Sequence, residues 1–175
     1  DVLLFRSKWE GFMKAAEELG LDVVAVEEMT IDTPDATAQS LRMRQAQPDA
    51  IVTILYPKPT IVFLRSAHQI GLTAMPVIGH TSVSDLKDLE GKVNLPGALD
   101  NFYTISLTAF TPSDAEAAPM AELLKKHMPN EELTQYHMWG IAAGERIVEA
   151  LKRAGEEPTR EKFVEALRSI TDFQP

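Results

Sequence analysis

The sequence predicts an α/β fold in which a Rossmann-like parallel sheet is flanked by helices. Helix and strand patterns alternate over about the first hundred residues, and three short apolar runs suited to strands open at Asp22, Asp49 and Pro76. Their spacing is 27 residues in both intervals, the length of a strand with its crossover helix, and such units join parallel strands through right-handed connections. The units share little sequence, so the repeat is one of length only.

Composition excludes several classes of protein. The 175 residues are 45% apolar and 25% charged, which is ordinary for one globular domain or two small ones. The absence of cysteine excludes disulfides, cysteine nucleophiles and zinc–thiolate sites. Lys and Arg total 17 against 26 Asp and Glu, and the net charge of −9 disfavours nucleic-acid binding, which needs a positive surface. No apolar run approaches the roughly 18 residues of a membrane span, and the first residues do not resemble a signal peptide.

The first half of the chain predicts helices over residues 5–19, 36–46 and 60–69. The first helix carries an apolar stripe at steps of four and three residues, formed by Phe5, Trp9, Phe12, Ala16 and Leu19. Gly20 then supplies the left-handed residue that commonly ends a helix.

The same half predicts strands over residues 22–26, 50–55 and 76–79. The second of these is apolar enough to be buried on both faces of a sheet. The residues 57–59, Pro-Lys-Pro, are expected to form a loop after it.

The second half changes in character. Ser82 and Asp85 form a predicted capping box for a short helix that ends near Leu89, and residues 101–107 predict a further strand. A Thr-rich connection over 108–112 follows. The remainder predicts only helices, over residues 114–127, 131–154 and from Pro158 onward. This helical tail is therefore expected to pack on a sheet that the chain itself does not supply.

No enzyme site can be assembled from these residues. The four histidines have no metal-ligand spacing, and neither G-x-G-x-x-G nor G-x-x-x-x-G-K-[ST] occurs among the nine glycines. The stretch 79–82 follows a strand but lacks the G-x-S-x-G spacing of a nucleophile elbow, and the Ser82 hydroxyl is expected to cap a helix. We therefore expect a non-catalytic protein without metal or cofactor.

Candidate ligand-binding residues follow the predicted strands. Open parallel sheets bind ligands outside the carboxyl ends of their strands, which here carry Tyr56 and Pro57 in one loop and His80 and Thr81 in the next. If a strand preceded Asp1, Phe5 would lie on the same edge. Aromatic faces suit an apolar ligand group, and hydroxyl and imidazole groups suit a polar one. The alternative is that Phe5 belongs to the core stripe and Tyr56 packs under its own loop.

Five segments follow one another in an order and spacing that resemble a known family. They are residues 11–20, 47–52, 67–79, 140–155 and 158–170, with sequences such as GFMKAAEELG, QPDAIV and PTRE. They are similar to the periplasmic solute-binding proteins of ABC importers, in the leucine/isoleucine/valine-binding (type I) group. The resemblance covers almost the whole chain.

This resemblance implies two α/β lobes joined by three crossings, with the ligand trapped between them. Residues 1–107 would form the second ligand-binding lobe without its first strand, and 108–112 a hinge crossing that includes Thr108 and Ala109. Residues 113–175 would then be the helical part of the first lobe. The fold is expected to be incomplete at both ends, so that the chain is a fragment or further residues are unrecorded.

The resemblance also implies roles for single residues. Phe5 falls where amino-acid binders of the family place an aromatic residue on the ligand, and His80 and Thr81 match a loop that faces the cleft. Residues 56–60 match a loop that carries an acidic residue for the ligand ammonium in those binders. No Asp or Glu stands there, which favours an aromatic or aliphatic carboxylate over an α-amino acid. Lys58 either indicates an anionic ligand or is an ordinary exposed lysine.

The function that the resemblance implies is capture of a small organic molecule by closure of two lobes, which an ABC transporter permease then recognises. The ligand would be a carboxylate or an amino-acid-like compound, and the protein would be exported to the periplasm or cell exterior. The alternative is a ligand-sensing domain of a receptor or regulator with the same fold. A third interpretation is a doubly wound enzyme whose catalytic residues lie elsewhere.

Overall fold

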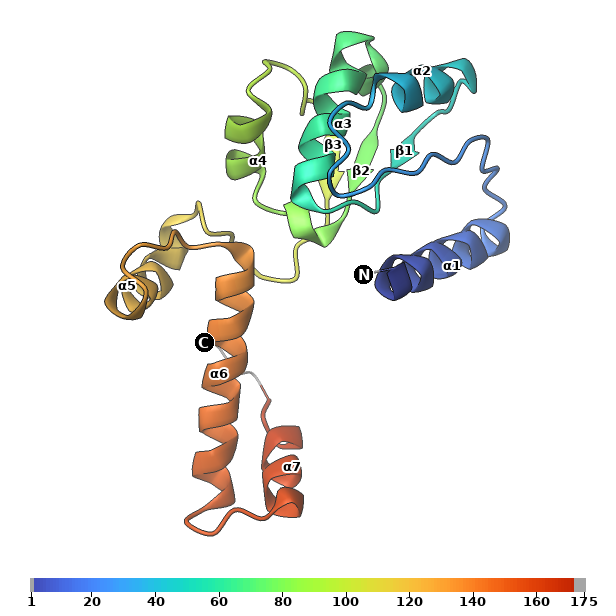
Figure 1. Ribbon diagram of the computed structural model, residues 1–175. Helices are drawn as coiled ribbons and strands as arrows, with labels where there is room; N and C mark the ends of the chain where they lie inside the picture. The colour runs from blue at the N-terminus through green and yellow to red at the C-terminus, as the bar shows by residue number, and fades with distance from the viewer. Residues whose placement is uncertain (1, 172–175) are drawn as a thin grey trace. The chain divides into compact units, whose positions relative to one another are not determined.

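The computed structural model describes the backbone of residues 2–171 and the side chains of residues 6–171. The chain divides into two compact units, Asp1–Ala109 and Phe110–Pro175. The elements of the first unit are α1 (Val2–Glu18), α2 (Thr37–Gln45), β1 (Ile51–Val52), α3 (Pro57–Gln69), η1 (Leu72–Ala74), β2 (Val77–Gly79), η2 (Thr81–Val83), α4 (Leu86–Val93) and β3 (Phe102–Thr104) (Figure 1). Those of the second unit are η3 (Ala115–Ala117), α5 (Ala118–His127), α6 (Gln135–Ala154) and α7 (Arg160–Arg168).

The first unit is built on a three-stranded parallel sheet in the order β1-β2-β3. Ile51 pairs with Val77, and Val77 pairs in turn with Phe102. This confirms the predicted parallel sheet and three of its strands. Each strand is only two or three residues long, so the ladder places the loops that follow the strands close to one another.

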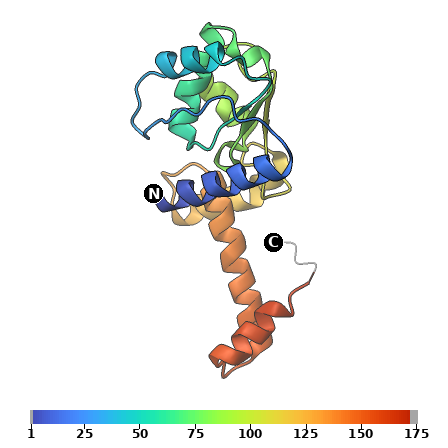
Figure 2. The same cartoon turned by 90° about the vertical axis from the view of Figure 1, so that its right-hand side faces the viewer.

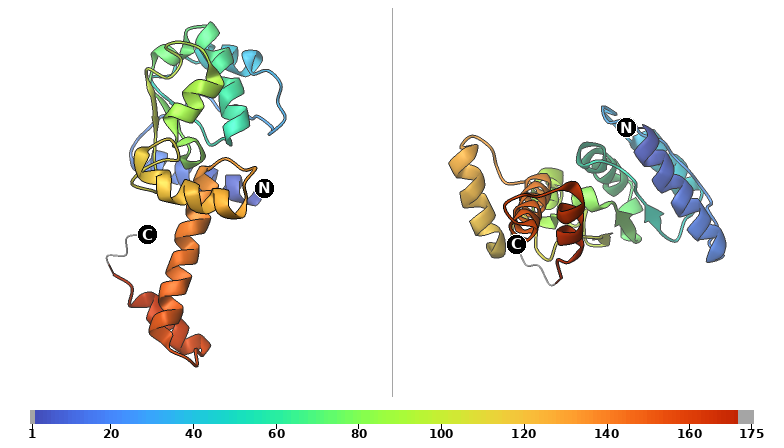
Figure 3. Two further views of the ribbon diagram at one scale, coloured as in Figure 1. Left: turned by 90° about the vertical axis from the view of Figure 1, so that its left-hand side faces the viewer. Right: turned by 90° about the horizontal axis from the view of Figure 1, so that it is seen from below.

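Helices cover one face of this sheet. Ile51, Val77 and Phe102 on that face are 3%, 1% and 6% exposed. They belong to a core that also contains Phe63, Leu64 and Ala67 of α3 and Leu89 and Val93 of α4. Figure 3 (left) shows α2, α3 and α4 on the same side of the strands. Full burial of an apolar side chain of this size contributes roughly 1.5–3 kcal/mol, so this layer is the main source of stability in the unit.

The opposite face carries a row of exposed apolar side chains. Val52, Ile78 and Tyr103 are paired across the three strands and are 39%, 38% and 57% exposed. The expectation that the β1 segment is buried on both sheet faces is therefore wrong for Val52. Strand side chains alternate between faces, and in the described residues only the face with Ile51 is packed by helices.

The strand predicted over residues 22–26 does not form. The segment is extended, and burial alternates along it, with Val23 and Ala25 half-buried and Val24 and Val26 about half exposed. No ladder pairs it with β1, β2 or β3. Alternating apolar residues specify an extended backbone with one covered face, but a strand also needs a neighbour that accepts its hydrogen bonds.

Two helix starts differ from their predictions. Helix α3 begins at Pro57 rather than at Thr60, because proline at the first helical position lacks only an N–H that would have no partner within the helix. Helix α4 is capped by Asp85, whose side chain accepts from Asp88 N at 3.1 Å. Ser82 lies in η2 instead, so its predicted capping role is wrong.

The second unit consists of helices, as predicted. Thr134 and His137 form a capping box at the start of α6, and the Thr159 side chain caps α7 by accepting from Lys162 N at 3.2 Å. Helices α6 and α7 lie side by side (Figures 1 and 2). Met138 of α6 packs with Ala117 and Met120 in a separate small core.

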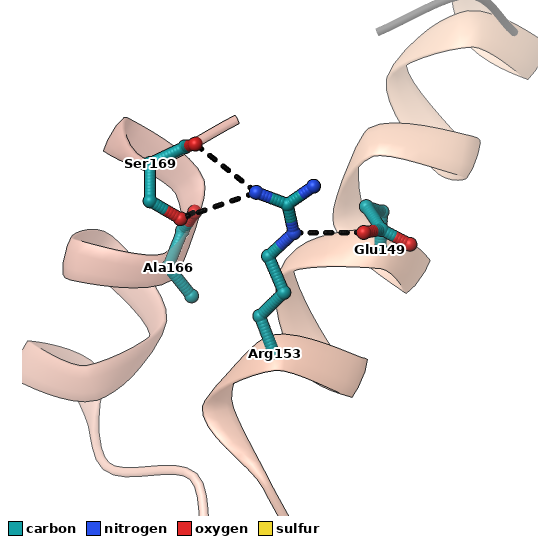
Figure 4. Close-up of polar contacts among 4 residues, drawn as sticks. All are labelled: Glu149, Arg153, Ala166 and Ser169. Carbon is teal, nitrogen blue, oxygen red and sulfur yellow. Dashed lines mark hydrogen bonds and ion pairs between the residues drawn. The ribbon is translucent and has the colours of Figure 1, made fainter. Parts of the chain in front are cut away.

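Arg153 ties the end of α7 to α6 (Figure 4). Its Nε donates to Glu149 Oε1 at 2.7 Å, and its Nη1 donates to the backbone oxygen of Ser169 at 3.0 Å. Ser169 is the C-cap of α7, so the guanidinium satisfies a carbonyl that has no partner within the helix.

Gly79 generates the first prediction. A Cβ atom at this position would lie 2.3 Å from Cζ of Phe102, whose ring is buried in the core. Gly79→Ala is therefore expected to destabilise the first unit by about 1–3 kcal/mol through overpacking. Urea-dependent hydrogen exchange at the Val77 amide, which donates to Asn101 O, measures this loss in the first unit alone.

Gly91→Ala is the matched control, because Gly91 lies within α4 and a Cβ there meets nothing within 4 Å. It should leave the unit unchanged or stabilise it by up to about 1 kcal/mol. The double variant Gly79→Ala/Phe102→Leu should recover part of the loss by removing the tip of the ring. Equal effects of Gly79→Ala and Gly91→Ala on the stability of the unit would contradict the close packing of the Phe102 ring on Gly79.

Arg153 generates the second prediction. Arg153→Met keeps the aliphatic stem and removes the hydrogen bonds to Glu149 and Ser169, so it should weaken the packing of α7 on α6 by about 0.5–1.5 kcal/mol. Amide exchange in the last turn of α7 should become faster. Arg146→Met on the same helix is the control, and a similar effect of both variants would argue against a specific role for Arg153.

Candidate functional site

The loops at the carboxyl ends of the three strands are joined by side-chain hydrogen bonds. Ser82 Oγ, after β2, donates to the backbone oxygen of Leu55 after β1 at 3.1 Å. Thr104 Oγ1, at the end of β3, donates to the backbone oxygen of His80 at 3.1 Å. The carboxyl edge of the sheet is thus one connected polar surface, where α/β sheets of this kind bind ligands. We call it the carboxyl edge.

Four of the predicted site residues lie along this edge. Tyr56 follows Leu55 directly and precedes α3, and Pro57 is the first residue of α3. His80 precedes η2, and Thr81 is its first residue. All four are half-buried. The side chain of Phe5 lies outside the described residues, and its role stays a prediction.

His80 has contacts on both ring nitrogens. Nδ1 lies 3.2 Å from the backbone N of Ser82 and 3.0 Å from its Oγ. Nε2 is in hydrogen-bond contact with Nζ of Lys8. Partial burial and, secondly, the positive charge of Lys8 lower the pKa of His80 below its ordinary value of 6.5. The imidazole is therefore neutral at neutral pH.

Lys8 is the residue at this edge that the sequence analysis missed. It lies on α1, half-buried, and is the one cation in hydrogen-bond contact with His80 among the described residues. Its position next to Trp9, on the border of the apolar stripe of α1, was the available signal. A lysine at such a border packs its stem on the apolar face while its ammonium reaches a polar site.

Lys58, in contrast, does not belong to the edge. Its Nζ forms an ion pair with Asp32 Oδ1 at 2.6 Å, and both side chains are largely exposed. This favours the alternative of an ordinary exposed lysine at Lys58, because its charge is paired at the surface.

Two further features are absent from the residues that the structure describes. Within them, no group of three or more His, Cys, Asp or Glu side chains is placed to hold a metal ion. Nor does any helix in this part of the chain combine the length and apolar character needed to cross a membrane.

Comparison with known proteins places this architecture in a family. The sequence profile described as periplasmic binding protein matches residues 5–174. The chain belongs to the periplasmic binding protein family. A comparison with curated proteins gives no match.

Solved structures share the type I periplasmic binding protein fold. A fatty acid ABC transporter substrate-binding protein from Thermomonospora curvata is 24% identical with a TM-score of 0.71, over 92% of this chain and 41% of that one. A leucine-binding protein from Thermotoga maritima is 25% identical with a TM-score of 0.65, over 93% and 45%. An ABC transporter solute-binding protein from R. palustris in complex with 4-hydroxybenzoate is 22% identical with a TM-score of 0.63, over 89% and 42%.

The periplasmic binding protein chain spans less than half the length of each of these structures. The assignment of residues 1–107, 108–112 and 113–175 to a lobe, a hinge crossing and part of the other lobe stays a prediction. At the hinge segment Ser106 Oγ donates to the backbone oxygen of Thr108 at 2.8 Å, and Phe110 packs against the small core of Ala117, Met120 and Met138.

The contact between Lys8 and His80 generates the third prediction. Lys8→Met should raise the pKa of His80 toward 6.5 without restoring it fully, because burial remains. A pH titration of the His80 Cε1–H signal by NMR measures this value. Lys14→Met is the control, since Lys14 lies on the same helix and pairs with Glu18.

The lowered pKa also fixes the sign of the effect on stability. Below pH 6.5 the unfolded chain binds a proton at this histidine before the folded one does, so the free energy of unfolding falls as the pH decreases from 6.5 to the folded pKa. His80→Gln should remove this contribution. An unchanged His80 pKa in Lys8→Met would contradict the contact.

Proposed function

We propose that the chain forms part of an exported solute-binding protein that captures a small organic molecule and delivers it to an ABC transporter permease. The observation that carries this proposal is the family match over residues 5–174. The polar carboxyl edge supports it, because it places Tyr56, His80 and Thr81 where parallel α/β sheets bind ligands.

The ligand class proposed is an aromatic or aliphatic carboxylate or an amino-acid-like compound. Two proteins of similar fold are named for a fatty acid and for leucine, and a third is in complex with 4-hydroxybenzoate; each of these compounds contains a carboxylate. At the carboxyl edge, the side chain of Lys8, a cation, is in hydrogen-bond contact with His80. An anionic group is therefore the better partner for this edge.

The mechanism proposed is binding and closure without a chemical step. The ligand would contact both lobes, with residues 1–107 in one and 113–175 in the other, and a hinge at 108–112 would let them close. Closure is favoured only by the difference in ligand affinity between the closed and open states. The closed state would be the form that a permease recognises in the periplasm or at the cell exterior.

Calorimetric titration of the purified 175-residue chain tests the proposal. Dodecanoate, L-leucine and 4-hydroxybenzoate are the probes, and glucose is the control without a carboxylate. We expect saturable binding of at least one probe at one site. At about 100 times its Kd this probe should stabilise the folded chain by about 2.7 kcal/mol in a thermal unfolding assay. Absence of binding by all three, or equal binding of glucose, would contradict the proposal.

A further inference from the structure

We propose that Lys8 and His80 form the subsite for a carboxylate group of the ligand, with Lys8 Nζ and His80 Nε2 as its two donors. The inference rests on the proposed function and assigns residues and a chemical group to it. Lys8 lies on the border of the apolar stripe of α1, and its pairing with His80 joins residues 72 positions apart.

Two residues that are far apart in the sequence converge at the carboxyl edge. Lys8 comes from α1 and His80 from the end of β2, and their polar atoms meet at one point of the carboxyl edge. In the part of the chain that the structure describes, Lys8 forms no ion pair with a carboxylate, unlike Arg6, Lys14 and Lys58. A half-buried ammonium whose protein partner is a neutral imidazole is incompletely compensated, because the imidazole offers no negative charge.

Both ring nitrogens of His80 face hydrogen-bond donors. A neutral imidazole carries one N–H and one lone pair. The backbone N–H of Ser82 points at Nδ1 from 3.2 Å and needs the lone pair there, while the ammonium of Lys8 needs a lone pair on Nε2. One ring cannot meet both demands.

Two tautomers therefore compete. With the proton on Nδ1, the ring donates to Ser82 Oγ at 3.0 Å and accepts from Lys8, but the Ser82 N–H loses its acceptor. With the proton on Nε2, Nδ1 accepts from Ser82 N, and an N–H then faces the ammonium. The second arrangement becomes favourable once the direct contact opens and a single acceptor takes hydrogen bonds from both Nε2–H and Nζ.

A carboxylate is the acceptor that resolves this conflict. Its oxygens accept from Nε2–H and from Lys8 at the same time, so the Ser82 N–H keeps the Nδ1 lone pair and the two competing donors each have an acceptor. Since burial and Lys8 lower the pKa of His80, the subsite carries a single positive charge at neutral pH, which matches the charge of one carboxylate. A neutral carboxamide offers one oxygen and no charge, so it should bind less tightly.

The experiment compares acids with their primary amides on the 175-residue chain. The probe pairs are dodecanoate and dodecanamide, L-leucine and L-leucinamide, and 4-hydroxybenzoate and 4-hydroxybenzamide. We expect the unmodified chain to bind at least one acid about tenfold or more tightly than its amide, the ratio that one charge-assisted hydrogen bond supplies. In Lys8→Met the ratio should fall below about threefold, and Lys14→Met should preserve it.

His80→Gln is the second variant, because Gln keeps a donor but has no tautomers. It should retain part of the preference for the acid through Lys8. The ¹⁵N signals of His80 provide an independent readout, with addition of the acid expected to move the proton to Nε2 and addition of the amide expected to change less. Far-UV circular dichroism checks that each variant is folded.

The outcomes separate the two proposals. Binding of an acid with an unchanged acid-to-amide ratio in Lys8→Met would overturn this inference and leave the proposed function standing. Binding of no probe by the unmodified chain would overturn both. A ratio lost in Lys8→Met and kept in Lys14→Met, with the shift of the His80 proton, would establish the subsite.

Discussion

The first unit depends on three very short parallel strands that pair in register and end at the same edge of the sheet. The pairing that joins Ile51, Val77 and Phe102 places the residues after each strand at one edge, where Ser82 and Thr104 link the loops by hydrogen bonds. Gly79 is the tightest point of this arrangement, because the Phe102 ring occupies the space that a Cβ would fill. Glycine at the end of β2 therefore allows the Phe102 ring to pack against the backbone directly before His80 and its loop.

The two faces of the sheet have opposite energetic roles. The face packed by α3 and α4 buries Leu64 and Val77 almost completely, and its apolar burial outweighs the small number of hydrogen bonds that strands of two or three residues make. The face with Val52, Ile78 and Tyr103 is largely uncovered in the described residues. Removing such a row from water is favourable, so the second face is where this unit has most to gain from further packing.

The sequence predicts elements whose signals are local. Gly20 after the stripe of α1 and Thr159 before α7 each act through neighbouring backbone groups, so their elements were found. The helix α3 was also found, but its start was predicted three residues late because residues 57–59 were expected to form a loop. The strand at 22–26 was wrong because a strand requires a partner that its own residues do not specify. Tyr56 and His80 were placed at the edge by the rule for parallel sheets. Lys8 was not, because its role depends on a contact 72 residues away.

The carboxyl edge links ligand contacts to the order of the loops that carry them. Ser82 has two roles there, since its Oγ holds the Leu55 carbonyl beside Tyr56 and its N–H competes with Lys8 for the lone pair of His80. In the proposed subsite, an acceptor that takes hydrogen bonds from both Lys8 and His80 would return that lone pair to Ser82 and so strengthen the hydrogen bond at the start of η2. Because the same serine joins the loops after β1 and β2, a ligand at His80 would also stabilise the backbone next to Tyr56. In this proposal, binding at one end of the edge would be coupled to the order of its other end through Ser82.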